Sequence, residues 1–503
     1  MMALSETAIN VGGGGEAQTD PQYLAFKLAN RHGLIAGATG TGKTITMQVL
    51  AEAFSRAGVP VFLTDIKGDV GGMALAGEDK QWQKKRAERI ALPSFEFRDT
   101  PVIFWDFFGE HGHPVRATIA EVGPVLFSRM LDLTEAQEGV INIAFRIADD
   151  EALPLLDLKD LRAMLVFLGE NQREISATYG NVTTASIGAI QRKLLVLENQ
   201  GATSFFSEPA LDFSDLMKTA ADGRGYVSIL HAERLMRTPH LYATFMLWFL
   251  SQLFEELPEV GNPEKPKLVF FFDEAHLLFT NAPRALVEKI EQVARLIRSK
   301  GVGIYFVTQN PDDVPDTVLS QLGNRVQHAL RAFTARDQQA LRKAAQTYRP
   351  NPRFDIANAI RDVGVGEAIT SFLEQKGEPG IAERTLIRPP ASGTGPINDG
   401  ARQMLMLKSP VAGKYEKTID SDSAHEMLER RAQAGAQAAA AAQKAPVADD
   451  SKVPGSSAPT SKTPARRGDT VVQAFAKSFA RQLGGRTGQA LIRGVLGGLF
   501  KGR

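Results

Sequence analysis

Short apolar runs alternate with helix-length segments along the chain from residue 33 onwards. The runs are Gly33–Ala36, Val59–Thr64, Val102–Asp106, Tyr226–His231, Leu268–Phe272, Gly301–Thr308 and Val326–Ala332. Most are dense in Val, Ile, Leu and Phe and lack a period of two, which is typical of strands buried on both faces. Helices are predicted between them at 43–57, 240–257 and 284–299. The pattern therefore predicts an α/β fold whose mainly parallel sheet is covered by helices.

Two segments depart from this alternation. Residues 1–20 contain a run of four glycines and are expected to be a flexible start. Residues 115–215 have helical spacing, scattered charges and few strand signals. They predict a mainly helical insertion that divides the core into a first part, 21–114, and a second part, 216–400.

The end of the core and the C-terminal region have their own patterns. Two extended runs at 367–374 and 380–388 flank a Gly/Pro turn and predict a hairpin. A C-terminal helical extension is expected over 401–443. Residues 444–468 are rich in Pro, Ser, Ala and Thr, which is the composition of a disordered linker. The remainder, 469–503, is predicted to be a basic amphipathic tail.

Composition narrows the class of protein but identifies no partner. The chain has 503 residues, 43% hydrophobic and 23% charged, with a formal net charge of +1. These values are ordinary for globular domains. The chain has no cysteine, which excludes disulfides and thiol chemistry. No secretory signal is visible, and the most apolar stretch, 241–254, is too short to span a bilayer. A cytoplasmic protein with no transmembrane segment is expected.

A glycine-rich motif follows the first apolar run, Gly33–Ala36. It fits the pattern G-x-x-x-x-G-K-[ST] in full and reads Gly37-Ala38-Thr39-Gly40-Thr41-Gly42-Lys43-Thr44, followed by Ile45. In this motif the glycines allow backbone N–H groups to surround phosphates, and the helix that follows adds its positive end. Lys43 is expected to reach the β- and γ-phosphates, and Thr44 to place a hydroxyl on Mg²⁺. The sequence therefore predicts a site for ATP and Mg²⁺.

Two carboxylates end the apolar run Leu268–Phe272. Asp273 is the candidate ligand for hydrated Mg²⁺, and Glu274 is the candidate base that polarises the attacking water. The alternative is a buried strand capped by solvated acids at a helix start. The upstream phosphate motif favours the catalytic interpretation. His276 completes a DEAH string, and it is expected to orient Glu274 or to pack against the strand end.

Other polar groups follow neighbouring strands. Gln309, after the strand at 301–308, is a candidate for sensing the γ-phosphate or placing the water, and the alternative is a Gln-Asn-Pro turn. Residues 65–69, Asp-Ile-Lys-Gly-Asp, follow the second strand, where either a solvated turn or a contact with the nucleotide crevice is expected. An arginine from a neighbouring subunit could stabilise the transition state. Arg325 is the chosen candidate among Arg31, Arg298, Arg325 and Arg331, although such arginines more often form surface ion pairs.

Taken together, these motifs resemble those of the HerA-like ATPases, a branch of the HerA/FtsK group of hexameric DNA-pumping motors. The resemblance extends over roughly residues 20 to 503 and includes a bacterial subfamily of uncharacterised HerA-like proteins. The segments that carry it are Asn30 to Thr44, Asp65 to Asp69, Phe272 to His276, Val307 to Pro311, Ser409 to Tyr415 and the Gly/Arg-rich tail.

The resemblance implies a RecA-type core, a hexameric ring of identical subunits and ATP-driven translocation on double-stranded DNA. It supports Lys43, Thr44, Asp273, Glu274 and Gln309 in the roles given above. It also makes Arg31, ahead of the P-loop strand, a second candidate for contacting the nucleotide. HerA proteins carry an N-terminal β-barrel that docks a nuclease. Only about 30 residues precede the P-loop strand here, too few for such a domain, which places the nuclease partnership in doubt.

Three classes of function fit these features. The leading one is a ring-forming, ATP-hydrolysing DNA translocase or helicase. The second is an ATPase switch or chaperone-like module that acts on a protein partner. The third is an interaction protein whose basic tail binds membrane or nucleic acid under control of ATP. The basic run at 84–86 could contact DNA phosphates, although short charge runs are usually solvated helix faces.

Overall fold

The computed structural model describes residues 7–444 except 79–80, 93–94, 281, 333 and 375. Within these residues twelve strands form one sheet with the order β2-β1-β12-β11-β10-β3-β9-β8-β4-β7-β5-β6. The block from β10 to β6 is parallel throughout. The four strands on the other side of β10 are joined by antiparallel pairs. The expected α/β fold with a mainly parallel sheet is confirmed.

The strands are β1 Ala8–Gly14, β2 Asp20–Ala25, β3 Gly33–Ala36, β4 Val61–Asp65, β5 Val102–Asp106, β6 His113–Pro114, β7 Val227–His231, β8 Leu268–Phe272, β9 Val302–Thr308, β10 Asn324–Gln327, β11 Glu367–Ser371 and β12 Glu383–Ile387. The helices are α1 Phe26–Ala29, α2 Lys43–Arg56, α3 Gln81–Arg89, α4 Ile119–Met130, α5 Glu135–Asp150, α6 Leu158–Glu170, α7 Gln172–Tyr179, α8 Thr184–Asn199, α9 Glu233–Met236, α10 Pro239–Glu256, α11 Arg284–Leu296, α12 Asp316–Leu319, α13 Ala335–Gln346, α14 Ile356–Asp362, α15 Asp399–Leu407 and α16 Ala424–Lys444.

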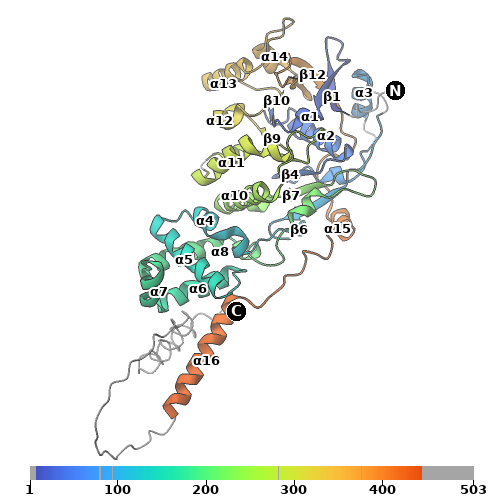
Figure 1. Ribbon diagram of the computed structural model, residues 1–503. Coiled ribbons are helices and arrows are strands. Elements are labelled where there is room, and N and C mark those ends of the chain that lie inside the picture. Colours follow the sequence, from blue (N-terminus) through green and yellow to red (C-terminus); the bar gives the residue numbers. More distant parts are fainter. Residues whose placement is uncertain are drawn as a thin grey trace, which may run out of the picture.

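Both faces of the parallel block are buried, as the unbroken apolar runs predict. Along β8, Phe270 and Phe272 point to one face and Phe271 points to the other, because successive side chains of a strand alternate. Phe249 of α10 packs 5.8 Å from Phe270, whereas Phe54 of α2 packs 6.4 Å from Phe271. Figure 1 shows α10 to α13 in a row along one side of the sheet and α2 on the other.

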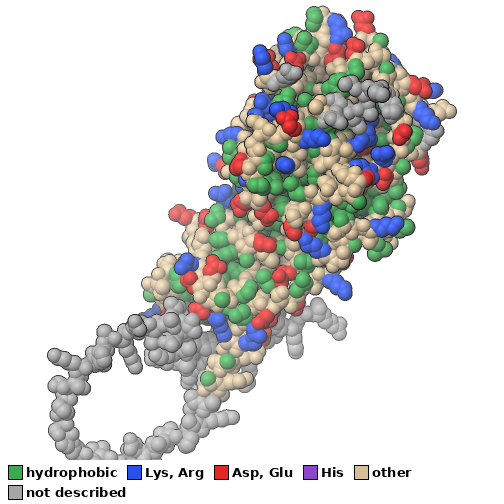
Figure 2. All heavy atoms as spheres, turned by 45° about the vertical axis from the view of Figure 1, so that its right-hand side comes forward, with side chains coloured by type: hydrophobic (Ala, Val, Ile, Leu, Met, Phe, Trp, Pro, Cys, Tyr) green, Lys and Arg blue, Asp and Glu red, His purple; other side chains and the backbone are tan. Residues whose placement is uncertain are grey.

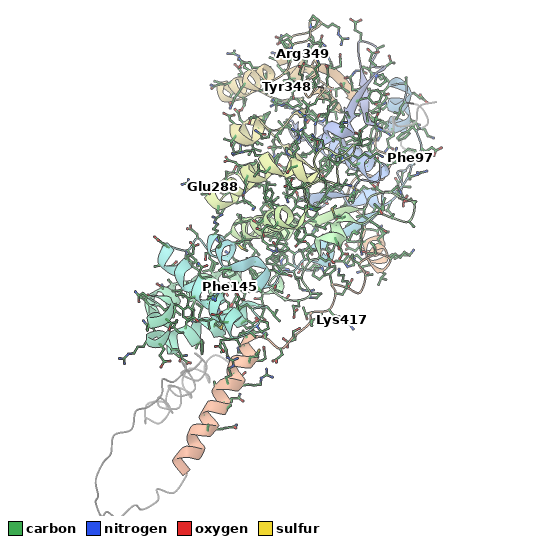
Figure 3. The ribbon with its side chains drawn as sticks, in the orientation of Figure 1. Phe97, Phe145, Glu288, Tyr348, Arg349 and Lys417 are labelled. Carbon is green, nitrogen blue, oxygen red and sulfur yellow. The ribbon has the colours of Figure 1, made fainter. Side chains whose placement is uncertain are left out.

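The segment 115–215 contains five helices, α4 to α8, which Figure 1 shows as a cluster beside α10. Their apolar residues are continuous with the core under α10. Phe205, just after these helices, stacks on Phe107 at 5.1 Å and meets Trp248 of α10 at 5.0 Å. Phe145 of α5 lies within the cluster, and Glu288 of α11 and Phe97 lie on opposite sides of the sheet (Figure 3). The insertion is therefore packed against the core.

The expected flexible start is wrong for residues 7–20, because β1 pairs with both β2 and β12. The first three glycines of the run that suggested flexibility belong to β1, and Gly15 follows it. A Cβ at Gly12 would overlap the carbonyl oxygen of Leu386, and one at Gly13 would overlap that of Gln18. Glycine is present here because two backbones approach closely.

The expected hairpin is present as β11 and β12, which pair antiparallel from Glu367↔Leu386 to Thr370↔Glu383. The strand expected at 326–332 begins and ends earlier, because β10 covers Asn324–Gln327 and the following residues leave the sheet to run beside the P-loop. The N–H of Ala38 donates to the carbonyl of Ala329 at 2.8 Å. A tertiary contact with the glycine loop thus ends the strand earlier than its apolar pattern suggests.

The C-terminal region crosses back over the core before α16. Buried Tyr415 donates its hydroxyl to Asp215, and Lys414 forms ion pairs with Asp212 at 3.0 Å and Asp215 at 2.7 Å. No helix among the described residues is long and apolar enough to cross a membrane. The predicted linker at 444–468, apart from its first residue, and the predicted basic tail at 469–503 lie outside the described residues.

Candidate nucleotide-hydrolysis site

The glycine motif forms the turn between β3 and α2. Gly42 has φ 118°, a left-handed conformation that favours glycine, and α2 begins at the next residue. Lys43 is buried, and its ammonium donates to the carbonyl oxygens of Gly37 at 2.7 Å and Ala38 at 3.2 Å. The loop and the first turn of α2 therefore present backbone N–H groups and a lysine at the carboxyl edge of the sheet.

The two acids after β8 have different surroundings. The N–H of Asp273 donates to Thr64 Oγ1 of β4 at 3.0 Å, which fixes its backbone to the neighbouring strand. Asp273 is buried, and its Oδ2 has no hydrogen-bond partner. Glu274 has φ 47° and ψ 46°, a left-handed conformation that is unfavourable for a non-glycine residue. Strained backbone of this kind is common where a structure must aim a functional side chain.

Both carboxylate oxygens of Glu274 are engaged. Lys67, from the loop after β4, forms an ion pair with Oε1. The side-chain amide of Gln309, directly after β9, donates to Oε2 at 3.3 Å. His276 Nδ1 lies 3.3 Å from the same oxygen but without hydrogen-bond geometry. Glu274 is therefore held in one position by groups from two neighbouring strand ends, and His276 lies beside it rather than bonded to it.

The protonation equilibria of these groups are coupled. Burial and the nearby charge of Glu274 raise the pKa of Asp273 to about 7, against the opposing effect of Lys67. Burial also acts to raise the pKa of Glu274, but the hydrogen bond and charge of Lys67 outweigh it and the net direction is downward. Burial lowers the pKa of Lys43, while Glu274 and Asp273 partly oppose that shift. The charges of all four side chains therefore interact at one place.

The residues present fit a magnesium ion. Asp273 offers a buried carboxylate oxygen without a protein partner, and Thr44 stands at the second position of α2 beside Lys43. Mg²⁺ is commonly bound by one or two protein oxygens together with substrate phosphates and waters. When bound, the ion would neutralise charge that develops on the β- and γ-phosphate oxygens. Thr44 and Asp273 are therefore the residues that would hold it.

The two arginine candidates are not at this site in the chain itself. Arg325 lies within β10, and its guanidinium donates to the carbonyls of Leu322 at 3.1 Å and Leu319 at 3.2 Å. Arg31 precedes β3, at the end of that strand opposite the P-loop, and its guanidinium lies against Gly377 in the β11–β12 turn. Within this chain, tertiary contacts at the amino-terminal ends of the strands occupy both side chains, so Arg31 is not placed to contact the nucleotide of its own chain. The role of Arg325 as a finger for a neighbouring subunit stays a prediction.

Residues 65–69 combine the two roles that the sequence left open. The Asp65 carboxylate accepts the N–H groups of Gly68 at 2.8 Å, Asp69 at 3.2 Å and Val70 at 3.2 Å, so it shapes the turn. Lys67, on the same turn, reaches Glu274. Lys67 was not singled out from the sequence, although its place after a parallel strand was a usable signal.

His328 was also missed, and no sequence signal indicated it. It follows β10 and is fully buried between the P-loop helix and β11. Burial lowers its pKa to about 4, so the ring is neutral at pH 7. Its Nδ1 donates to the carbonyl of Glu367 at 2.9 Å, which leaves Nε2 to accept the hydroxyl of Thr46 at 2.8 Å. His328 therefore ties the first turn of α2 to the start of β11.

The whole arrangement matches a described protein family. Residues 13–503 match the model of the family described as helicase HerA-like C-terminal. The chain belongs to this family. The match covers β1's last residues, the P-loop, the acids after β8 and the β11–β12 hairpin, so the helicase HerA-like C-terminal family accounts for the core as well as for the single motifs.

Individual proteins are more distant. The chain is 30% identical over 124 residues to “Probable helicase MJECL08” of Methanocaldococcus jannaschii, a match that spans 24% of this chain and 22% of that relative. Among solved structures, it is similar to VirB4 of Thermoanaerobacter pseudethanolicus, with TM-score 0.49, 13% identity and coverage of 77% of this chain and 98% of that one. It is also similar to plasmid coupling protein TrwB in complex with ADP and Mg²⁺, with TM-score 0.44, 17% identity and coverage of 78% and 92%. Both structural likenesses concern the fold.

Proposed function

We propose that this protein hydrolyses ATP at the carboxyl edge of its sheet and uses the energy to move double-stranded DNA through a ring of identical subunits. One observation carries the hydrolysis: Lys43 of the P-loop and the acids Asp273 and Glu274, far apart in the sequence, lie close enough for their charges to interact. Lys43 binds the β- and γ-phosphates, Thr44 and Asp273 hold Mg²⁺, and Glu274 and Gln309 place and polarise the attacking water.

Membership of the helicase HerA-like C-terminal family and the segment shared with the Methanocaldococcus protein support DNA as the substrate. The charge distribution on the surface gives no such support for DNA. On the face drawn in Figure 2, Lys and Arg side chains are interspersed with Asp and Glu, so no surface of one sign marks a DNA path there. A protein partner is therefore the second candidate, and the same experiment separates the two.

The experiment measures ATP turnover at low salt with and without linear duplex DNA, alongside particle mass by light scattering with and without nucleotide. We expect DNA to stimulate turnover severalfold, added salt to weaken that stimulation because phosphate contacts release counterions, and nucleotide to favour a multi-subunit particle. Lys43→Ala is the control and should abolish turnover. ATP turnover that does not change when DNA is added would favour a protein partner. A particle that stays monomeric with nucleotide would contradict the proposed ring. Absence of turnover by the unmodified protein would contradict the proposed ATPase activity.

A further inference from the structure

The order of strands sets the direction in which a bound nucleotide extends. Glu274 follows β8 and Gln309 follows β9, both on one side of β3, from which the P-loop emerges. The γ-phosphate faces these two residues if the proposed function holds, and the inference below rests on it. The nucleoside at the other end of the triphosphate then extends towards the opposite neighbours of β3, which are β10 and β11.

A turn before β11 adjoins the P-loop on that side. The N–H of Gly366 donates to the carbonyl of Thr41 at 2.9 Å. The Cα of Gly366 also lies 3.2 Å from the position that a Cβ on Gly42 would take. The preceding residue, Val365, leaves 71% of its surface exposed. An exposed apolar side chain therefore lies beside the part of the loop from which the nucleoside would emerge.

Arg86 of α3 lies against the same turn. Its Nη2 donates to the carbonyl of Val365 at 3.3 Å, and a Cβ on Gly366 would overlap its guanidinium. The guanidinium carbon is 5.2 Å from the centre of the Trp82 ring, one turn earlier on α3. Figure 1 places α3 on the same side of the sheet as α2, the P-loop helix. A planar cation is thus held in one orientation by a carbonyl, a glycine and an aromatic ring.

We propose that Arg86 and Val365 form the platform on which the base of the bound nucleotide rests, with Trp82 supporting the guanidinium from behind. A guanidinium stacks on aromatic faces, and the flat, apolar face of a purine fits a surface made of one planar cation and one aliphatic side chain. Gly366 is required because any side chain there would displace the guanidinium. The ligand class is a purine nucleoside triphosphate, and Arg86 contributes to affinity for its base.

Two ligands separate the base from the phosphates. Isothermal titration calorimetry in Mg²⁺ compares ATP with inorganic tripolyphosphate, which has the phosphates but no nucleoside. Arg86→Ala is expected to weaken ATP binding about tenfold and to change tripolyphosphate binding less than twofold. Arg89→Ala removes an exposed arginine from the next turn of α3 and is the matched control, expected to change neither. Arg86→Lys keeps the charge but loses the planar group, so it should remain as weak as Arg86→Ala.

Several results would contradict this platform. Equal weakening of ATP and tripolyphosphate by Arg86→Ala would show that the arginine acts on the P-loop through Gly366 and not on the base. Unchanged ATP affinity, or full recovery in Arg86→Lys, would exclude stacking. If Arg86→Ala left both ligands bound normally but abolished stimulation by DNA, α3 would be a DNA contact instead. Failure of the unmodified protein to bind tripolyphosphate would overturn the proposed function rather than the assignment of Arg86.

Discussion

Two strand ends at the carboxyl edge of the sheet carry the same sequence pattern, but their aspartates differ in hydrogen bonding. An apolar run followed by aspartate occurs at the end of β5, in Val102–Asp106, and at the end of β8, where Asp273 follows Phe272. Asp106 accepts the N–H groups of Phe108 at 3.0 Å and of Glu110 and His111 at 2.8 Å. Asp273 is equally buried, but its Oδ2 has no partner.

The difference separates an aspartate whose oxygens are bonded by its own loop from one that keeps an unbonded, buried oxygen. Asp106 is satisfied by its own loop, so its charge stabilises the turn that follows β5. Asp273 has no donor at its Oδ2, and burial raises its pKa to about 7, which is the expected consequence of holding a carboxylate without enough donors. A bound cation would remove that penalty. The chemistry of a strand end is therefore determined by what the following loop donates, and not by the aspartate alone.

The acid next to Asp273 gives the largest test of this comparison. Glu274→Gln keeps the size of the side chain and one oxygen that accepts a hydrogen bond, but it cannot take a proton from water. We expect kcat for ATP to fall about a thousandfold, on the order of 4 kcal/mol in the barrier, with nucleotide binding retained. Steady-state turnover and calorimetric binding check the two parts. Turnover within tenfold of the unmodified protein would show that another group is the base.

Matched asparagine substitutions test the two aspartates directly. Asp273→Asn should lower kcat about a hundredfold or more through loss of Mg²⁺ binding, yet leave the nucleotide-free fold as stable or more stable, because it removes a buried unpartnered charge. Asp106→Asn should leave kcat within twofold and lower the free energy of unfolding by about 1–3 kcal/mol through weakened loop hydrogen bonds. Turnover and urea unfolding measure both. Equal losses of stability would erase the distinction between the two regions.

Much of the candidate nucleotide site at this edge could be predicted from the sequence. Lys43, Asp273, Glu274 and Gln309 follow apolar runs, and parallel strands bring their carboxyl ends to one edge, so the pattern alone places these residues together. The strands at 33–36, 102–106 and 268–272 are found with the expected bounds. These predictions succeeded because burial on both faces leaves a strong signal in the sequence.

The features that failed depend on contacts with distant residues. Gly12 was read as flexible because a sequence does not show that Leu386 will lie against it. Arg31 was placed beside the nucleotide because a sequence does not show that its guanidinium will lie against Gly377. Lys67 was overlooked because the partner that gives it a role, Glu274, is 207 residues away. Such roles are fixed by tertiary packing rather than by local pattern.

A substitution of Lys67, in the candidate nucleotide site, is expected to have a smaller effect on turnover. Lys67→Ala removes the cation that holds Glu274, and we expect kcat to fall about tenfold with little change in the KM for ATP. Lys67→Arg should recover most of the loss because a cation returns to the same carboxylate. Lys159→Ala, an exposed lysine of α6, is the control and should change neither constant. A rise in KM without a change in kcat would show that Lys67 contacts the phosphates of bound ATP instead.

The last comparison concerns stability and not turnover, and it involves two histidines at the same edge: fully buried His328 beside the P-loop and half-buried His231 at the end of β7. Burial lowers the pKa of His328 from 6.5 to about 4, and the charge of Lys43 adds to that shift. The unfolded state therefore binds more protons between these values, so the stability that the neutral ring confers is complete above pH 6.5 and lost progressively by about pH 4.

His328→Gln should accordingly be less stable than the unmodified protein at pH 8, and this difference should shrink by about 3 kcal/mol as the pH falls from 6.5 to 4. Urea unfolding of the nucleotide-free protein at several pH values measures it. Asp273 titrates in both proteins, and its raised pKa has the opposite effect on stability. Its contribution therefore cancels when the stability of one protein is subtracted from that of the other. His231→Gln should show a weaker dependence, because burial and the neighbouring His111 lower its pKa in a more exposed position. Equal pH dependence in both variants would mean that burial affects the pKa of His328 and of His231 to the same extent.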